Sequence, residues 1–563
     1  MRKTRLRDKG IEPTEPSPAP DGRVTSGSRL SLDTSASGNS SLIAVGLSLL
    51  LLYLTLLFPG HPGEFDGDTL RQIPLEMPVI VLALLLVKGR AAYWLGKVLV
   101  LTLGSLLLLR LADLGSFLAF NRRFNPLLEM HLLADGWNLA STTIGPLEAA
   151  VVVLLMLLVL GLLAGLLYRG LLTIAQTRGR TRRLLIPLSL ISLMIGSILL
   201  YKVEPSRESF TISARVVPEF RQRITSLLAS IRDQQLFIGE LQEDTVLDRS
   251  EPTFASLQGR DVILVFVESY GRGYLDAERF ADAARNRLTT TENTLEKAGL
   301  KARSGWLTSP IRGGRSWLAH ATLQSGLEVD NQARFDRLIS TDRNSLSRLF
   351  QRAGWHTIGV MPAIQLAWPE GAWYGYESLH VAADMGYAGE RFGYVTMPDQ
   401  YTLSHFEQAL RHQHDGPIMA TLALLSTHAP WTPLPQKVDW DTIGDGSLFD
   451  GSQRFGEPIS WKYRDRVQDM YIRSFDYTLE ILGEYAAQFA DDALIIVVGD
   501  HQPPPIINGW GASGDVPIHF ISRDSSLLAR LPDAQWVDGM QPDDSIQSQR
   551  MASLRGSLSI LFE

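Results

Sequence analysis

The segment Ala493-Leu-Ile-Ile-Val-Val-Gly-Asp500-His501 contains the pattern that decides the fold. Its apolar run predicts a buried β-strand that ends in a carboxylate and an imidazole. A second segment, Asp261-Val-Ile-Leu-Val-Phe-Val-Glu268-Ser269, has the same form. Ligands of open α/β sheets bind outside the carboxyl ends of the strands, so we expect Glu268, Asp500 and His501 to form one metal site. Taken alone, the Asp-His pair would equally suit a strand-end salt bridge or cap.

Composition sets the broad class of the protein. A chain of 563 residues is long enough for two or three structural units. Hydrophobic residues make up 45% of it and are concentrated before residue 203. The net charge of −7 gives no indication of a nucleic-acid partner. Because the chain has no cysteine, disulfides, thiolate metal ligands and a cysteine nucleophile are excluded.

Four regions follow one another along the chain. Residues 1–40 are rich in Ser, Pro, Gly and Arg, which predicts a disordered cytoplasmic tail. Residues 41–203 are predicted to form a transmembrane domain, because each apolar segment approaches the roughly 20 residues that a membrane-spanning helix needs. Residues 204–258 are predicted to be a juxtamembrane helical connector, and residues 259–563 an extracytoplasmic catalytic domain. The five apolar segments are 42–59, 73–88, 92–112, 147–168 and 184–202.

Basic residues predict the orientation of these spans. Lys and Arg are frequent in the N-terminal tail, in the loop with Lys88 and Arg90, and in the loop from Arg169 to Arg183. Cytoplasmic loops carry such an excess, so five spans would place residues 203–563 outside the cytoplasm. We therefore expect a multi-pass membrane protein whose C-terminal domain lies outside the cytoplasm. The alternative is a large buried hydrophobic core in a protein without membrane spans.

The C-terminal half alternates between strand and helix patterns. This alternation predicts a three-layer α/β domain. The expected strands are 261–268, 356–361, 417–425, 493–499 and 517–522, and the expected helices are 316–325, 343–353, 401–412 and 465–489.

A nucleophile candidate lies in Ile311-Arg-Gly-Gly-Arg-Ser316-Trp-Leu-Ala-His320. Two glycines allow the backbone to approach an anion, and Ser316 stands where a helix is expected to begin, near the positive end of its dipole. Arg315 can add positive charge, as can Arg312. Ser316 is otherwise a plain helix N-cap. His320 lies one turn later, where it either points into the same cleft or packs.

Several short motifs together resemble the alkaline phosphatase–sulfatase superfamily. They are Glu268 at a strand end, Gly-Arg-Ser316-Trp, Ser-Thr-His428-Ala-Pro-Trp and Gly-Asp500-His501, in that order. With five apolar segments ahead of them, the chain looks like the lipoteichoic acid synthase and phosphoglycerol transferase branch. The resemblance implies a sulfatase-like fold, four metal ligands, a covalent nucleophile at Ser316 and a phosphate contact from His428. The implied ligands are Glu268, Ser316, Asp500 and His501.

The headgroup pocket of that branch has a tryptophan followed two residues later by an arginine. Here the nearest match is Trp368-Pro-Glu370, so an acid replaces the arginine. Glu370 and the nearby Trp373 would suit a cationic headgroup such as ethanolamine or choline. The alternative is that this loop does not correspond to the pocket. The sulfatase Cys/Ser-x-Pro-x-Arg motif is missing at Ser316, and His519 does not match a second metal site, so we expect one metal.

These patterns together predict a membrane-bound, metal-dependent transferase. It would move a phospholipid headgroup phosphate, of the phosphoglycerol or phosphoethanolamine type, through Ser316 to a glycan or lipid hydroxyl in the cell envelope. Oxygen and nitrogen ligands suit one divalent ion, with Mn²⁺ favoured and Zn²⁺ or Mg²⁺ as alternatives. A phosphodiesterase or sulfatase-like hydrolase of the same fold would need the same site. A catalytically silent membrane receptor or scaffold would be expected to have broken ligands.

Overall fold

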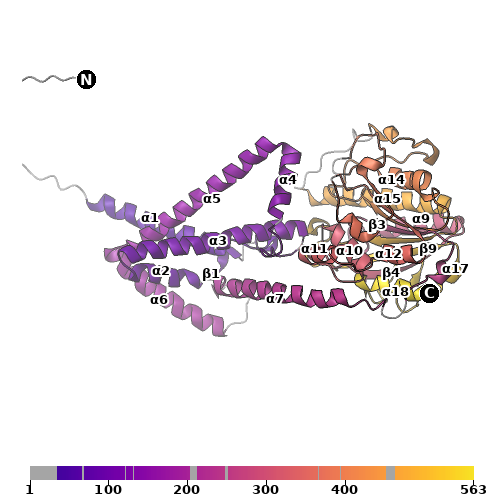
Figure 1. Ribbon diagram of the computed structural model, residues 1–563. Helices are drawn as coiled ribbons and strands as arrows, with labels where there is room; N and C mark the ends of the chain where they lie inside the picture. Colours follow the sequence, from indigo (N-terminus) through magenta and orange to yellow (C-terminus); the bar gives the residue numbers. More distant parts are fainter. Residues whose placement is uncertain are drawn as a thin grey trace, which may run out of the picture.

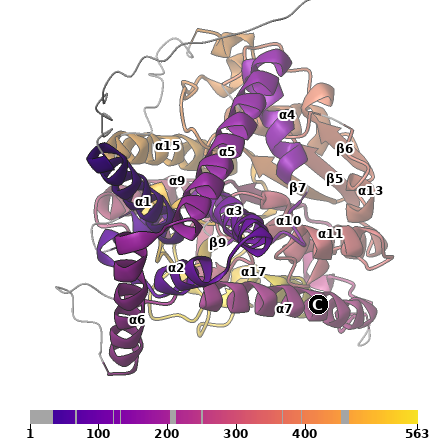
Figure 2. The same cartoon turned by 90° about the vertical axis from the view of Figure 1, so that its left-hand side faces the viewer.

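The computed structural model describes residues 34–65, 69–120, 122–130, 132–202, 212–247, 251–365, 367–392, 395–451 and 463–563. Most of the expected 1–40 tail lies outside these residues. A helical N-terminal part and an α/β part lie side by side and are bridged by one long helix, α7 (Figure 1). Viewed from the helical end, α1, α2, α3, α5 and α6 stand in front of the α/β part (Figure 2).

Five helices cover the five predicted apolar segments: α1 (Thr34–Leu57), α2 (Glu76–Leu86), α3 (Arg90–Phe120), α5 (Pro146–Ala175) and α6 (Gly179–Lys202). Three are long and apolar enough to cross a membrane: α3, α5 and the stretch Gly179–Ile198 of α6. The apolar part of α1, Leu42–Leu57, and helix α2 are shorter. The described residues thus contain three candidate spans, and the five-span arrangement stays a prediction.

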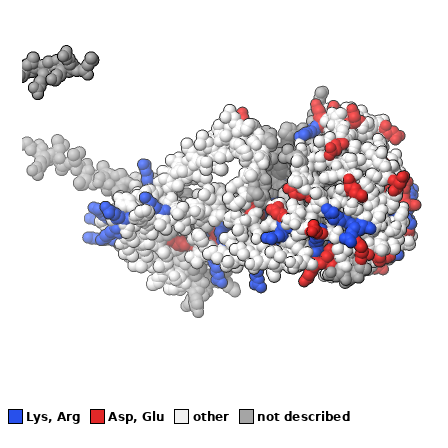
Figure 3. Space-filling view, viewed as in Figure 1, with Lys and Arg blue, Asp and Glu red and all other residues white. Residues whose placement is uncertain are grey.

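The surface of the helical part is apolar. Along α5, Leu154, Leu157 and Leu158 are each more than half exposed, and an apolar helix with this exposure suits lipid rather than water. Lys and Arg gather at the end of this part that lies away from the α/β part (Figure 3). Among the exposed basic side chains of the helical part are Lys88 and Arg90, between α2 and α3, and Arg178 and Arg180, near the α5–α6 turn. The predicted orientation places basic residues at one end of the helical part, on the cytoplasmic side. That this end faces the cytoplasm stays a prediction.

The α/β part is built on a nine-stranded sheet. Its strand order is β10-β4-β9-β8-β3-β7-β5-β6, with β11 beside β4. Strands β8, β3, β7, β5 and β6 run parallel, and every residue of β3 and β8 is buried. Continuous apolar runs are what parallel strands covered on both faces need. The strands are β3 (Val262–Val267), β4 (Lys301–Thr308), β5 (His356–Met361), β6 (Ser378–Val381), β7 (Ile418–Leu424), β8 (Leu494–Gly499), β9 (Asp515–Ser522), β10 (Val537–Asp538) and β11 (Gln549–Arg550).

Helices cover both faces of this sheet. Alternate residues of β3 enter two different cores, as the period of a strand requires. Ile263, Val265 and Val267 belong to the core under α9 (Ala281–Lys297), α14 (Asp399–His405) and α15 (Arg464–Phe489). Phe266 belongs to the core under α10 (Ser316–Ser325), α12 (Leu346–Arg352) and α18 (Leu554–Leu561). The predicted three-layer α/β arrangement is therefore present.

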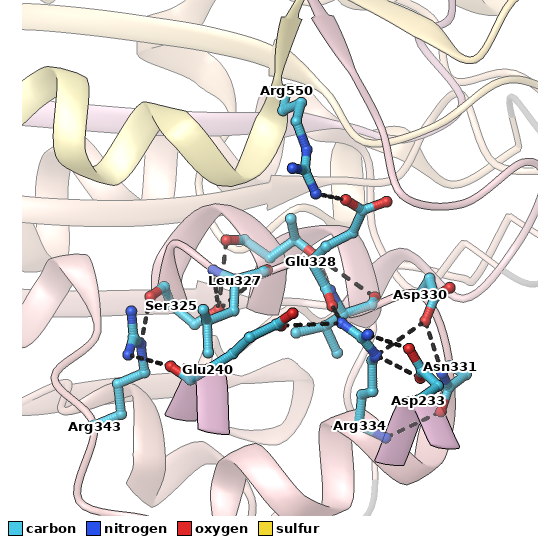
Figure 4. Close-up of polar contacts among 12 residues, drawn as sticks. Asp233, Glu240, Ser325, Leu327, Glu328, Asp330, Asn331, Arg334, Arg343 and Arg550 are labelled. Carbon is cyan, nitrogen blue, oxygen red and sulfur yellow. Dashed lines mark hydrogen bonds and ion pairs between the residues drawn. The ribbon is translucent and has the colours of Figure 1, made fainter. Parts of the chain in front are cut away.

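Helix α7 (Val216–Gln242) is fixed to both parts of the molecule. Near its start, Glu219 lies 2.8 Å from Arg110 of α3. Near its end, Asp233 and Glu240 pair with Arg334 of α11 (Gln332–Ile339), as Figure 4 shows. The guanidinium of Arg334 also lies 4.6 Å from the ring centre of Phe237, on α7. These contacts hold the helical part in a defined position against the α/β part.

Replacing Gly499 by alanine tests the strand pairing. A Cβ atom there would lie 1.9 Å from the carbonyl oxygen of Tyr270, so the end of β8 must move. We expect Gly499→Ala to lower the free energy of unfolding by about 1–3 kcal/mol and to weaken metal binding. Gly511→Ala is the control, because its Cβ meets nothing within 4 Å. Equal thermal unfolding temperatures and equal metal contents for the two purified variants would contradict this.

Candidate active site

The pairing of β3 with β8 brings the predicted metal ligands together. Val267 is in register with Gly499, so the next residues, Glu268 and Asp500, leave the sheet side by side. His501 follows directly. Ser316 reaches the same edge from the first position of α10, after a loop of two glycines.

The distances among these four side chains are short. The Ser316 hydroxyl donates a hydrogen bond to Glu268 Oε2 at 2.6 Å and lies 3.2 Å from His501 Nε2. His501 Nε2 lies 3.2 Å from Glu268 Oε1 and 3.8 Å from Asp500 Oδ1. The candidate ligand atoms of Glu268, Asp500 and His501 all lie within 4.8 Å of one another, and all three residues are buried. The predicted cluster is thus assembled as expected.

Backbone groups orient the candidate ligands. Asp500 Oδ1 accepts hydrogen bonds from the Ser269 amide at 2.8 Å and the His501 amide at 2.6 Å. His501 Nδ1 lies 2.8 Å from the Gln502 carbonyl oxygen, and donation there leaves Nε2 free to bind a metal. Sequence reasoning missed Ser269 and Gln502 as supporting residues. Their adjacency to Glu268 and His501 was the only available signal.

The electrostatics favour a cation between these groups. Burial, followed by the charge of Glu268, raises the pKa of Asp500 well above its usual value. Burial opposes ionisation of Glu268 as well, but the charges of His501 and His428 and the Ser316 hydrogen bond hold its pKa well below the usual range. Burial would lower the pKa of His501, yet the charges of Asp500 and Glu268 raise it to about 9.

The donor set therefore fits a divalent metal ion. Two buried carboxylates at such close range repel each other unless a cation lies between them. Carboxylate and imidazole are ligands that Mn²⁺ and Zn²⁺ accept, and Mg²⁺ takes the oxygen ligands. Glu268, Asp500 and His501 can hold such an ion, with the Ser316 hydroxyl beside it.

A cavity of about 360 Å³ lies next to this cluster. Its wall includes predicted site residues from five separate stretches of the chain. Much of the rest is apolar or aromatic, from Phe266, Met361, Ile364, Tyr374 and Leu425. Glu370 is not part of the wall, although it was expected in the pocket with Trp368. The predicted residues in the wall are Glu268, Arg315, Ser316, His320, Trp368, His428 and Asp500.

The two further histidines differ in character. His320 stacks on Phe266 with ring centres 3.9 Å apart, and burial lowers its pKa to about 4, so the ring is neutral at pH 7. His428 is exposed, and its Nδ1 lies 2.5 Å from the Ala429 carbonyl oxygen. The exposed imidazole of His428, at the cavity wall, can approach a phosphate. His320 instead forms part of the cavity wall with a neutral ring.

Metal binding is expected to depend on pH. An ion must displace the proton of His501, and its pKa of about 9 means that the proton is present at pH 7. Apparent metal affinity should therefore rise between about pH 6 and pH 9, with at least about one proton released per ion at pH 7, because the raised pKa of Asp500 adds to the release from His501. Calorimetry in buffers of different ionisation enthalpy measures this release. His501→Ala should abolish binding, while the exposed His414→Gln should not; equal affinities for both would contradict the ligand assignment.

Comparisons with known proteins give one family match and several similar solved structures. Residues 260–513 match the model of the sulfatase family. Similar solved structures include the lipoteichoic acid synthase LtaP from Listeria monocytogenes, at 15% identity and a TM-score of 0.35, covering 48% of this chain and 67% of that one. Another is the soluble domain of lipooligosaccharide phosphoethanolamine transferase A from Neisseria meningitidis, at 14% identity and a TM-score of 0.35, covering 54% and 88%.

A phosphonate monoester hydrolase from Silicibacter pomeroyi is also similar, at 12% identity and a TM-score of 0.30, covering 54% of this chain and 73% of that one. No curated protein matches the sequence. The expected likeness to the alkaline phosphatase–sulfatase superfamily is confirmed by the family match. Over residues 260–513, a little under half of the chain, the sequence is similar to the sulfatase family.

Proposed function

We propose that the chain is a membrane-bound phosphotransferase that moves the headgroup phosphate of a phospholipid through a covalent intermediate on Ser316. One observation carries this proposal. The Ser316 hydroxyl lies within 3.2 Å of both Glu268 and His501, beside a cavity large enough for a headgroup. A plain helix N-cap would not need two buried carboxylates and a buried imidazole around it.

In the first step, the Ser316 hydroxyl, which donates to Glu268 Oε2 at 2.6 Å, loses its proton to solvent, and its Oγ attacks the phosphorus of the lipid phosphodiester. A bound divalent ion would lower the pKa of this hydroxyl and neutralise charge on the phosphoryl oxygens. The bond to the diacylglycerol oxygen breaks, and that oxygen takes a proton from His428 at the cavity wall. Diacylglycerol leaves, and the headgroup phosphate stays on Ser316.

In the second step, a hydroxyl group of a glycan or lipid attacks the phosphoserine. His428, now without its proton, accepts the proton of that hydroxyl, and the bond from phosphorus to Ser316 Oγ breaks to release the alkoxide that starts the next cycle. Water in place of the second hydroxyl would make the protein a phosphodiesterase. Both outcomes use the same residues, so the acceptor decides between transfer and hydrolysis.

The membrane setting of this reaction rests on the helical part. Three helices long and apolar enough to cross a membrane would hold the site near a lipid donor and near the diacylglycerol that leaves. We place the protein in a bacterial inner membrane with its catalytic domain in the periplasm. Mn²⁺ is the ion we favour.

The headgroup is proposed to be of the phosphoglycerol or phosphoethanolamine type. Trp368 and Tyr374, with ring centres 5.3 Å apart, belong to the cavity wall and can attract an ammonium group. Glu370 is not among the residues that line the cavity. The preference for a cationic headgroup therefore depends on the aromatic pair.

Loss of the Ser316 hydroxyl tests the proposed reaction. Ser316→Ala should lower metal-dependent release of diacylglycerol by about 10⁴-fold or more, because the covalent route is lost. Ser526→Ala, at an exposed serine, is the control. Unchanged turnover in Ser316→Ala would refute the assignment. Full metal loading of the wild type with no turnover of any phosphodiester would favour the silent receptor or scaffold.

Donor preference tests the headgroup class. The protein is supplied separately with phosphatidylglycerol, phosphatidylethanolamine and phosphatidylcholine, and diacylglycerol release is measured for each. If the aromatic pair selects an ammonium group, Trp368→Leu should lower kcat/KM for the cationic donors by about 5- to 30-fold, which corresponds to about 1–2 kcal/mol. A preference for phosphatidylglycerol that survives Trp368→Leu would contradict this choice.

A further inference from the structure

The loop that carries the nucleophile packs directly against the end of α3. Gly313 and Gly314 both have positive φ, at 75° and 59°. A Cβ atom on Gly313 would lie 3.0 Å from the Ala119 carbonyl oxygen, and one on Gly314 would lie 3.1 Å from the Phe120 ring. The loop is therefore glycine-rich because its backbone touches the last turn of a candidate membrane span.

Arg315 continues this contact and precedes Ser316 directly. Its φ of 63° is left-handed, a conformation that costs energy in a residue with a side chain. Its guanidinium lies 4.7 Å from the ring centre of Phe120, and Nη2 lies 3.4 Å from Glu129 Oε1. The Arg315 and Glu129 side chains are only 3% and 1% exposed, so this ion pair is shielded from water.

Glu129 is itself held in place. Its Oε2 accepts a hydrogen bond from the Asn125 amide at 2.9 Å, and its Oε1 also pairs with Arg122. The helix before this connector is anchored too, because Asp113 of α3 lies 2.7 Å from Arg223 of α7. Glu129 thus presents a fixed buried charge to the residue next to the nucleophile.

The geometry points to Glu129 as a positioning residue for Ser316. The segment that follows α3 holds Arg315 in its left-handed conformation, and this sets where the first residue of α10 places its hydroxyl against Glu268. The helical part thereby completes the support of the site in the α/β part, beyond anchoring it to a membrane. This inference rests on the proposed function, in which Ser316 Oγ attacks the phosphorus.

The test uses the full chain in detergent, with phosphatidylethanolamine and phosphatidylglycerol as probe donors. Glu129→Gln keeps the size and removes the charge. We expect kcat to fall about 10- to 100-fold, because a misplacement of about 1 Å costs on the order of 100-fold. Metal affinity should not change, since no ligand is touched. Glu129→Asp, which keeps the charge, should recover part of the loss in kcat.

Arg122→Gln is the matched control. It removes a partner of the same carboxylate, but Arg122 is 33% exposed, so its effect on kcat should stay below about threefold. Wild-type kcat in Glu129→Gln, with Ser316→Ala inactive, would overturn the positioning role and leave the proposed function intact. A wild-type protein that binds metal but releases no diacylglycerol would instead defeat the proposed function.

A second variant decides the case in which Glu129→Gln folds poorly. Phe120→Leu removes the ring beneath Arg315 and leaves the ion pair. Like Glu129→Gln, it should lower kcat, while metal binding is retained. Wild-type kcat in Phe120→Leu would then overturn the inference.

Discussion

Two carboxylates leave one buried sheet edge side by side. The rest of the structure depends on this constraint. Glu268 and Asp500 follow adjacent parallel strands whose residues are paired along their whole length. Burial and mutual repulsion push the pKa of Asp500 well above its usual value, while the charge of His501 keeps that of Glu268 well below it. Buried groups of like charge are tolerated only when a cation or a hydrogen-bonded partner compensates them. The imidazole, the backbone amides and the expected metal ion all provide this compensation.

The proposed nucleophile, Ser316, is positioned both by this sheet edge and by residues outside the α/β part. Ser316 begins a helix whose preceding residues adopt a run of left-handed conformations. That run packs against Ala119 and Phe120, so the site draws on two parts of the molecule that the sequence separates by nearly 200 residues. A candidate membrane span contacts the loop before Ser316. Through this contact the helical part is proposed to help position Ser316, in addition to any role in lipid access.

Much of this architecture could be predicted, because buried parallel strands have a plain signature. The apolar runs of β3, β8, β5 and β7 were expected within a residue of their observed ends, and α10 begins at Ser316 as its glycines indicated. Strand β4 was not expected, because its sequence has neither a continuous apolar run nor a regular alternation of apolar and polar residues. The strand is Lys301-Ala-Arg-Ser-Gly-Trp-Leu-Thr308. Helix α9 was also not expected, because most of its residues are polar and only a narrow stripe of them is buried.

Other features of the structure depend on the folded chain and have no local pattern in the sequence. Glu370 stands two residues from Trp368, yet it does not line the cavity as Trp368 does. The pairing of Arg315 with Glu129 joins residues 186 positions apart, which composition and spacing cannot reveal. Helix α2 is 11 residues long, and the second membrane span stays a prediction.

Mass spectrometry of the covalent intermediate tests the central claim most directly. The full chain is loaded with metal, mixed with phospholipid and quenched in acid, and the peptide that contains Ser316 is weighed. The account predicts a mass increase equal to one headgroup phosphate on Ser316, and none on that peptide when His501 is replaced by alanine. An unmodified Ser316 during steady turnover, or an adduct on a different residue, would contradict it.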